Sequence, residues 1–345
     1  MSYPLNIKRL AGRDQERWNN FVLEHPEGTF FHLAEWADIF QKVLRHNTYY
    51  LMAESSGSVD GVLPLVYMQS RVIGRALIST PFLVYGGVIA KTDRTAEALE
   101  REACSLAKDL NVDYLELRDR RPTGFPGILK TNYVTFRKEI PNDTDACLAA
   151  VPRKQRAMIR KGIANGLRTE VDSDISRFYT ILSESYRNLG TPILSARYFA
   201  AINDTFPDNC EIRTVIHKRR AVASVMSFYF KETIFPYYGG GTGGARSLKA
   251  ADFMYWDLMR QCPERRVSVF DYGRSRINTG SYRFKKHWGF EPSPLYYRCQ
   301  LISDRPLVDV SPSNSRYRLA SAAWKRLPVS ITRVVGPRIA RGIPG

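Results

Sequence analysis

The sequence predicts a mixed α/β fold in two tandem domains, and three observations lead to this expectation. The chain has 345 residues, more than one hydrophobic core usually organises, so two domains of about 150 residues each are expected. Segments with strand-like and helix-like patterns follow one another along both halves. The triplet Tyr85-Gly86-Gly87 is echoed by Tyr238-Gly239-Gly240, which favours an internal duplication.

The first half, residues 1–140, predicts the first domain. Apolar residues at helical spacing indicate helices at 14–25, 34–44 and 92–110, and β-rich runs indicate strands at 49–53, 62–68, 112–117 and 133–140. Asp60-Gly61 is expected at the turn of the first hairpin. Trp36, on the second helix, is either a core anchor or a substrate contact, and the core role is favoured.

Residues 141–170 contain a strongly basic segment. After a turn-rich linker, a short helix is expected to carry Arg153, Arg156 and Arg160 on one face, together with Lys154 and Lys161. Such a stripe can follow the phosphates of RNA or of a nucleotide-linked precursor. The alternative is a solvated, charged helix face.

The second half, residues 141–302, predicts the second domain. Helices are expected at 175–189 and 196–206, then strands at 211–216, 221–230 and 233–238. A glycine run leads into the ADFMYW helix, followed by a strand at 267–271, a helix at 282–288 closed by Gly289, and a strand at 294–301. Residues 303–345 form a basic tail, in which residues 317–327 could form a basic helix. The tail either touches an anionic membrane surface or is a loosely packed terminus.

The glycine run indicates a place where a backbone can approach a ligand. It is expected to form a loop before a helix N-terminus, where free N–H groups and the helix dipole favour an anion. A phosphate or pyrophosphate site is one interpretation, and a flexible loop without ligand is the other; a dinucleotide fingerprint fits poorly, because a hairpin precedes the run. The glycines concerned are Gly239, Gly240, Gly241, Gly243 and Gly244.

Composition bounds the compartment and the partners. The N-terminus lacks an apolar leader, no run reaches about 18 apolar residues, and the mean hydropathy is −0.32. Five scattered cysteines indicate reduced thiols, and the histidines lack metal-ligand spacing, so a cytoplasmic protein without a metal is expected. The net charge of +17 favours polyanionic partners, although many basic proteins bind no nucleic acid.

Several motifs of the second half resemble those of FemAB-related proteins. The motifs are PYYGGG, ADFMYW, FDYGRS, NTGSYRFKKHWGFEP and PLYY. In particular they resemble the subgroup associated with the exosortase/PEP-CTERM system and exopolysaccharide loci. The resemblance covers most of the chain and implies two tandem acyltransferase-like domains of the GNAT type.

The resemblance also implies site residues. FKKHWGF is similar to a segment of Fem transferases whose lysine lies at the donor ester, so Lys285 is the first candidate for stabilising the oxyanion, with Lys286 as its neighbour. The alternative is that both are surface lysines. Asp271 ends a strand, where it could accept a proton or, as is favoured, hold Arg274. Further candidates for substrate binding are Arg187 and Thr191, by resemblance, and Tyr238 and Tyr282, for their hydroxyl groups.

The expected function is that of an acyltransferase that forms an amide on an amine-bearing saccharide or peptide precursor of the cell envelope. The donor is an acyl-CoA or an aminoacyl-tRNA rather than a tightly bound cofactor. The choice stays open, because the acetyl-CoA signature Q/R-x-x-G-x-G/A is not cleanly present and no long helical arm for tRNA is seen. Peripheral contact with the inner membrane is possible. Alternatives are a non-catalytic GNAT-like module that binds a nucleotide-linked or glycan precursor and, more weakly, an RNA-binding protein.

Overall fold

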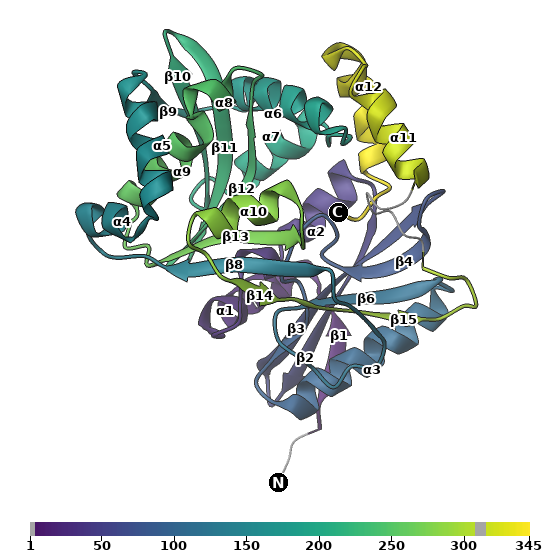
Figure 1. Ribbon diagram of the computed structural model, residues 1–345. Coiled ribbons are helices and arrows are strands. Elements are labelled where there is room, and N and C mark those ends of the chain that lie inside the picture. Colours follow the sequence, from purple (N-terminus) through teal and green to yellow (C-terminus); the bar gives the residue numbers. More distant parts are fainter. Residues whose placement is uncertain (1–3, 308–314) are drawn as a thin grey trace. The chain divides into compact units, whose positions relative to one another are not determined.

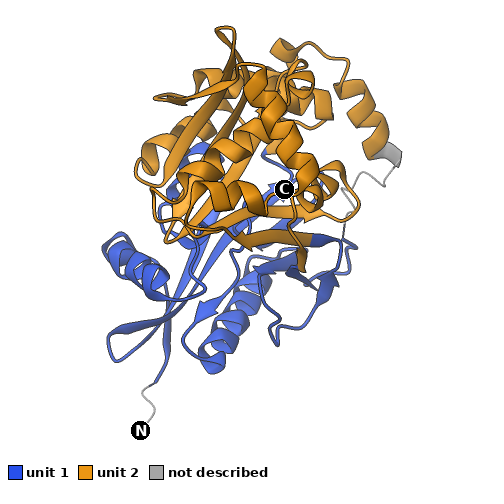
Figure 2. Ribbon diagram, turned by 60° about the vertical axis from the view of Figure 1, so that its left-hand side comes forward, with its two compact units in different colours: residues 1–133, 294–309, 341–345 blue, residues 134–293, 310–340 orange. Residues whose placement is uncertain are grey.

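The chain divides into two compact units, which are described separately. The computed structural model describes residues 4–307 and 315–345. Unit 1 comprises the described residues within 1–133, 294–309 and 341–345, and unit 2 those within 134–293 and 310–340 (Figure 2). This division differs from the expected 1–140, 141–302 and 303–345. Residues 134–140 belong to unit 2, residues 294–302 belong to unit 1, and residues 315–340 of the expected tail belong to unit 2.

Unit 1 is built on one mixed sheet (Figure 1). Its strands are β1 (Asn6–Arg9), β2 (Asn47–Ser55), β3 (Ser58–Ser70), β4 (Gly74–Ser79), β5 (Ile89–Ala90), β6 (Tyr114–Asp119), β7 (Ile128–Lys130) and β15 (Tyr296–Leu301). The order is β1-β2-β3-β4-β6-β15-β7, with β5 on β3, and β4 and β6 are parallel. The helical segments are η1 (Gly12–Asp14), α1 (Gln15–Glu24), η2 (Phe30–His32), α2 (Trp36–Asp38), η3 (Ile39–Val43) and α3 (Asp93–Asp109).

The first hairpin turns at Ser56-Gly57 and not at Asp60-Gly61 as expected. Ser56 and Gly57 have φ of 49° and 80°, the positive values that a two-residue hairpin turn requires. Asp60 and Gly61 lie inside β3 instead. Gly61 lets α3 approach the sheet, since a Cβ there would lie 3.0 Å from Leu99 Cδ1.

Unit 2 also contains one mixed sheet, in the order β14-β8-β13-β12-β11-β10-β9. The strands are β8 (Tyr133–Glu139), β9 (Arg168–Asp172), β10 (Cys210–His217), β11 (Arg220–Phe230), β12 (Thr233–Gly241), β13 (Val269–Arg276) and β14 (Pro292–Pro294). The helices are α4 (Thr144–Ala150), α5 (Arg153–Ala164), α6 (Ser176–Leu189), α7 (Ala196–Thr205), α8 (Ala245–Leu248), α9 (Ala250–Gln261), α10 (Gly280–His287), α11 (Ser315–Trp324) and α12 (Val329–Ala340).

The two sheets exchange strands at the edges of their parallel pairs. Strand β8, expected in the first domain, belongs to the sheet of unit 2, and β15, expected in the second, pairs antiparallel with β6 in unit 1. Residues 341–345 also belong to unit 1, where Phe82 N donates to Pro344 O at 2.6 Å and Ser70 Oγ to Gly342 O at 2.7 Å. Local patterns predict a strand but not the sheet that it joins.

Most of the described part of the expected tail is helical, and α11 overlaps the helix expected at 317–327. Helix α11 is followed by α12, which contains Pro337. Thr332, Gly336 and Ala340 recur at four-residue spacing on the buried face of α12, and this helix packs on α6. Residues 308–314 of the expected tail lie outside the described residues. Among those described, no helix combines the length and the apolar character needed to cross a bilayer.

Candidate functional site

The parallel strands β12 and β13 pair only where they begin. Their register joins Thr233 and Ile234 to Val269 and Phe270, the first two residues of each strand. On its other side, β12 continues to pair with β11 as far as Gly241. In open α/β sheets, ligands bind beyond the carboxyl ends of parallel strands, which makes this end of unit 2 the first place to look for a site.

Lys285 on α10 holds the carboxyl end of β13. Its Nζ donates to the main-chain oxygens of Tyr272 at 2.7 Å, Gly273 at 3.1 Å and Arg274 at 3.2 Å. The side chain is buried, with 7% exposed, and its Nζ lies 5.6 Å from the ring centroid of Phe136. Its neighbour Lys286 is exposed. Lys285 is therefore not a surface lysine.

The charge of Lys285 is poised near neutral pH. Burial lowers its pKa to about 7, against the opposing effect of the Asp271 charge. The three carbonyl groups accept hydrogen bonds only, and therefore favour the protonated amine. As an ammonium, Lys285 has all three N–H groups engaged, so direct contact with a reacting oxygen requires it to release one carbonyl.

Asp271 shapes the same strand end. Its Oδ1 accepts hydrogen bonds from Gly273 N at 2.7 Å and from Thr135 Oγ1 at 3.4 Å. Gly273 has a φ of 62°, a left-handed conformation that glycine adopts without strain. Asp271 thus fixes the bend of the main chain whose carbonyl groups accept hydrogen bonds from Lys285. Arg274, its expected partner, is half-buried and supplies one of them.

The predicted glycine loop is in large part a strand. Gly239, Gly240 and Gly241 extend β12 and pair with Val225, Ser224 and Ala223. A Cβ on Gly239 would lie 3.3 Å from Tyr255 Oη on α9, and one on Gly240 would lie 2.8 Å from Ser185 Cβ on α6. Successive residues of a strand face opposite sides, so these glycines let helices pack closely on both faces of the sheet.

Only residues 242–244 turn between β12 and α8, and the amides of Thr242 and Gly243 have partners inside the protein. Thr242 N donates to Val222 O at 2.9 Å. Gly243 N donates to Glu184 Oε1, on α6, at 2.8 Å. A donor phosphate at Gly243 would therefore have to displace the Glu184 carboxylate. No sequence pattern connects Glu184 with this turn.

Tyr238, Tyr282 and Trp36 are placed mainly by packing. The hydroxyl of Tyr238 lies 3.0 Å from that of Tyr198, and burial raises its pKa well above the usual value. Tyr282 is half-buried, with its ring 5.4 Å from that of Phe136. In unit 1, Trp36 is fully buried and its Nε1 donates to Phe30 O at 3.0 Å, as the core role requires.

Arg187 and Thr191 lie at the contact between α6 and α11. Arg187 donates from Nη1 to Lys325 O at 3.3 Å. Thr191 lines a cavity of about 340 Å³, together with Arg318 of α11 and Lys325, which follows that helix. Thr191 thus lines a basic cavity of unit 2, and Arg187 is bonded to the main chain of Lys325, one of the cavity's lining residues.

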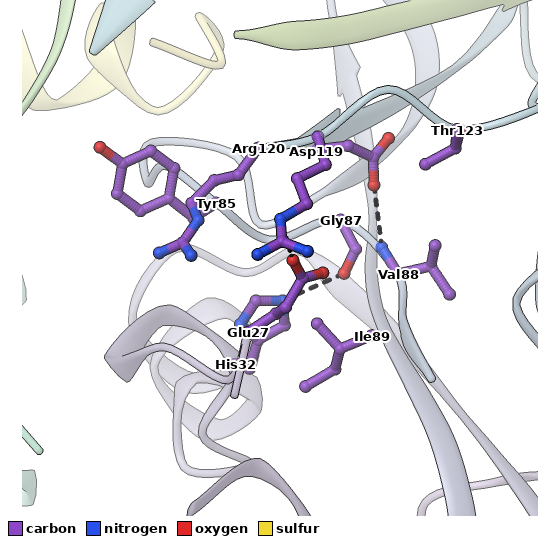
Figure 3. A pocket seen from close by; sticks show the side chains of 10 residues that line it. Glu27, His32, Tyr85, Gly87, Val88, Ile89, Asp119, Arg120 and Thr123 are labelled. Atoms are coloured by element: carbon purple, nitrogen blue, oxygen red, sulfur yellow. Dashed lines mark hydrogen bonds and ion pairs between the residues drawn. The ribbon is translucent and has the colours of Figure 1, made fainter. Parts of the chain in front are cut away.

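Unit 1 holds a smaller polar cavity, of about 30 Å³, that sequence reasoning missed (Figure 3). Asp119, at the end of β6, accepts a hydrogen bond from Val88 N at 3.1 Å, and its Oδ2 has no hydrogen-bond partner in the described structure. Burial raises its pKa to about 8, and the Glu100 charge adds to this. His32 Nε2 lies 3.0 Å from Gly87 O. The only sequence signal was the echo at Tyr85-Gly86-Gly87.

The basic helix α5 is present as expected. Gln155, Ile159 and Gly162 form its buried face, while Arg153, Lys154, Arg160 and Lys161 are exposed. Arg156 is half-buried and donates to Ala149 O at 2.7 Å. The stripe remains compatible with a solvated face and with phosphate binding.

Comparison with known proteins identifies the fold. Residues 153–286 match the family model described as "Acetyltransferase (GNAT) domain". No curated protein sequence matches the chain. FemX has a similar structure, with a TM-score of 0.68 at 14% identity over 86% of this chain and 97% of FemX.

Two further solved structures are similar. A tandem GNAT protein from the clavulanic acid biosynthesis pathway has a TM-score of 0.57 at 12% identity, over 88% of this chain and all (100%) of that one. The C-terminal domain assigned to a lysylphosphatidylglycerol synthetase of Agrobacterium fabrum has a TM-score of 0.57 at 12% identity, over 90% and 94%. The chain has the mixed α/β fold of tandem GNAT proteins, and its second unit carries the matched GNAT segment.

Proposed function

We propose that the protein is an N-acyltransferase whose reaction takes place in unit 2. The observation that carries this proposal is the buried Lys285 at the end of a parallel strand pair that separates after two residues, inside the segment that matches the GNAT model. A transferase of this kind needs no protein nucleophile, because the acceptor amine attacks the acyl carbon directly.

The reaction forms one bond and breaks one. The amine nitrogen bonds to the acyl carbon, the bond from that carbon to the donor's sulfur or oxygen breaks, and the amine proton passes to the leaving group. Lys285 supplies positive charge where the oxyanion develops, and Asp271 keeps the end of β13 in place through Gly273. Tyr238, Arg274, Tyr282, Arg187 and Thr191 are the proposed substrate-binding residues, and the fully buried Trp36 is left to the core of unit 1.

The donor is an acyl-CoA or an aminoacyl-tRNA, and the acceptor is an amine on a saccharide or peptide precursor of the cell envelope. The resemblance to the PEP-CTERM-associated subgroup supports exopolysaccharide biosynthesis in the cytoplasm, at the inner membrane. FemX and the domain assigned to a lysylphosphatidylglycerol synthetase share the fold, which supports the aminoacyl option. The engaged amide of Gly243 also disfavours a phosphate of CoA at that turn.

The same observation favours a second candidate, a GNAT-like module that binds a nucleotide-linked or glycan precursor without turnover. Binding of an acyl-CoA and of a charged tRNA, measured at two salt concentrations, separates the possibilities. Salt-tolerant, saturable binding of the thioester indicates a CoA-type enzyme. Preference for charged over uncharged tRNA indicates an aminoacyl transferase, and binding of neither supports the module.

Lys285→Ala is expected to lower turnover by about 100- to 1000-fold, the usual cost of losing one oxyanion-stabilising group. Lys286→Ala is the matched control, because its side chain is exposed on the same helix, and it should keep wild-type turnover. Circular dichroism confirms that each variant is folded. Full turnover by a folded Lys285→Ala variant would remove this lysine from the mechanism.

A further inference from the structure

Helices α11 and α12 of unit 2 carry charge of one sign. From Tyr317 to Ala340 the sequence has five basic residues and no acidic residue; the basic ones are Arg318, Lys325, Arg326, Arg333 and Arg338. The proposed transfer chemistry uses none of these side chains. A long uniformly basic segment attracts an extended anionic surface rather than a single charged group.

The exposed side of α12 carries four aliphatic side chains together with Arg338. Ile331, Val334, Val335 and Ile339 are all exposed, and Val334 is 65% exposed. Thr332, Gly336 and Ala340 of the same helix are buried. On α11, Leu319 is 73% exposed. Exposed aliphatic side chains that gather on one face of a helix mark a surface that something else covers.

A cavity with cationic walls lies beside α11 and the end of α6. It measures about 340 Å³ and is lined by Arg318 and Lys325, by the hydroxyl groups of Thr191 and Ser321, and by Leu189. No carboxylate is among the described lining residues. Gly190 lets α11 approach closely, since a Cβ there would lie 2.1 Å from Ser321 Oγ. Two cations and two hydroxyls around one space suit a phosphate group.

We propose that α11 and α12 bind the surface of a bilayer that contains anionic phospholipid, and that the cavity receives a lipid phosphate. Helices with basic side chains beside exposed aliphatic ones lie in the bilayer interface, where the cations meet phosphates and the aliphatic groups enter the acyl boundary. A second copy of this chain fits less well, because a symmetric contact would set the same cations against each other. The surface does not depend on the proposed transfer chemistry.

Co-sedimentation with vesicles tests the proposal on the full chain. The protein should bind vesicles of phosphatidylcholine with phosphatidylglycerol and should not bind phosphatidylcholine alone, and added salt should weaken binding. In the double variant Arg318→Ala/Lys325→Ala, affinity should fall about fivefold for each cation removed. In Val334→Asp, it should fall at least about tenfold, because a charged group replaces an inserted aliphatic one.

Two matched controls keep the test specific. Leu23→Asp places the same charge on α1, where Leu23 is 55% exposed. Arg153→Ala/Lys154→Ala removes two exposed cations from α5. Both should bind vesicles as the wild type does. An equal loss in the α5 variant would mean general charge attraction and would overturn the proposal, as would unchanged binding by a folded Val334→Asp protein.

Two other outcomes assign the surface differently, and a third separates this inference from the proposed function. Soluble glycerol phosphate that binds as tightly as vesicles would make the cavity a free-phosphate site. A dimer in light scattering that Val334→Asp abolishes, without vesicle binding, would make the face a contact between copies. Vesicle binding together with absent turnover would uphold this inference and count against the acyl transfer, so the two proposals fail separately.

Discussion

The parallel strand pairs of the two units differ in how they treat a buried cation. In unit 1, Arg118 on β6 donates to Glu116 Oε1 at 2.7 Å, and Lys130 also pairs with Glu116. In unit 2, Lys285 faces three main-chain carbonyls at the end of β13. The first arrangement joins opposite charges, whereas the second surrounds one charge with neutral dipoles.

The pKa shifts follow from this difference. Burial raises the pKa of Glu116, but the charges of Lys130 and Arg118 outweigh it and hold the pKa well below the usual value. Burial lowers the pKa of Lys285 to about 7, and no comparable charge pair restores it. A paired charge is fixed at every physiological pH, and a cation held by carbonyls can respond to its surroundings. We therefore propose that the charges around Glu116 have a structural role and that Lys285 has a chemical role.

Breaking the charge cluster of unit 1 has the largest expected effect. Glu116→Gln leaves Arg118, which is 1% exposed, without its carboxylate, and should lower the free energy of unfolding by about 3–5 kcal/mol. Denaturant unfolding measures the change. Glu97→Gln is the control, because Glu97 pairs with Arg101 at an exposed site. A folded Glu116→Gln enzyme that loses turnover at low temperature would contradict the division of roles.

Asp119 tests the cost of a buried carboxyl without a hydrogen-bonded cation. Its folded pKa of about 8 exceeds the unfolded value of about 4, so the native state binds the proton more tightly and stability should fall as pH rises from about 4 to 8. In Asp119→Asn, the free energy of unfolding should not fall over this pH range, and near pH 8 it should exceed that of the wild type by about 2 kcal/mol. Thermal unfolding measured at a series of pH values tests this prediction. Asp208→Asn, at an exposed site, is the control. Parallel stability curves for the wild type and Asp119→Asn would contradict the prediction.

The pH dependence of turnover sharpens the role of Lys285. If the ammonium stabilises the oxyanion, kcat should fall about tenfold for each pH unit above the pKa near 7. If the neutral amine acts as a base, kcat should instead rise toward that pKa and level off. Lys286→Ala should keep the wild-type profile. A flat profile across this range would deny Lys285 either role.

The smallest expected effect concerns the turn after β12. Glu184→Gln keeps an acceptor for Gly243 N but removes the negative charge. If donor phosphate lies at this turn, affinity for acyl-CoA should rise about threefold, as for other charges near a helix N-terminus. Acyl-pantetheine, which lacks the nucleotide phosphates, serves as the control ligand. Unchanged affinity for acyl-CoA would place its phosphates elsewhere.

Much of the local structure could be predicted, because its signals lie close together in sequence. Gly190 and Gly289 both take positive φ, at 79° and 76°, where the sequence predicted that helices end. The glycines of β12 were predicted to form a loop, but Gly239, Gly240 and Gly241 extend the strand. Glycine occurs both where a chain turns and where a helix packs closely on a sheet, so its presence alone does not decide between the two. Only the partners Tyr255 and Ser185 decide between the two.

The candidate site was predicted in part. Lys285 was singled out by resemblance, but its three carbonyl partners follow from the fold. Glu184 and Gly243 are 59 residues apart, and Asp119 is 31 residues from Val88, so no local pattern joins them. Sequence periodicity reports which residues share a face of one element, and it carries no information on contacts between distant elements.

The exchange of strands between the units also affects how the protein folds during its synthesis. During synthesis, β6 is made long before β15, the strand that covers its edge. Until then, the nascent sheet of unit 1 has an open edge of unpaired N–H and C=O groups, which invites pairing with other chains. Unit 1 cannot be completed from residues 1–140 alone, because β15 belongs to its sheet. A fragment that ends near residue 140 should therefore aggregate rather than fold.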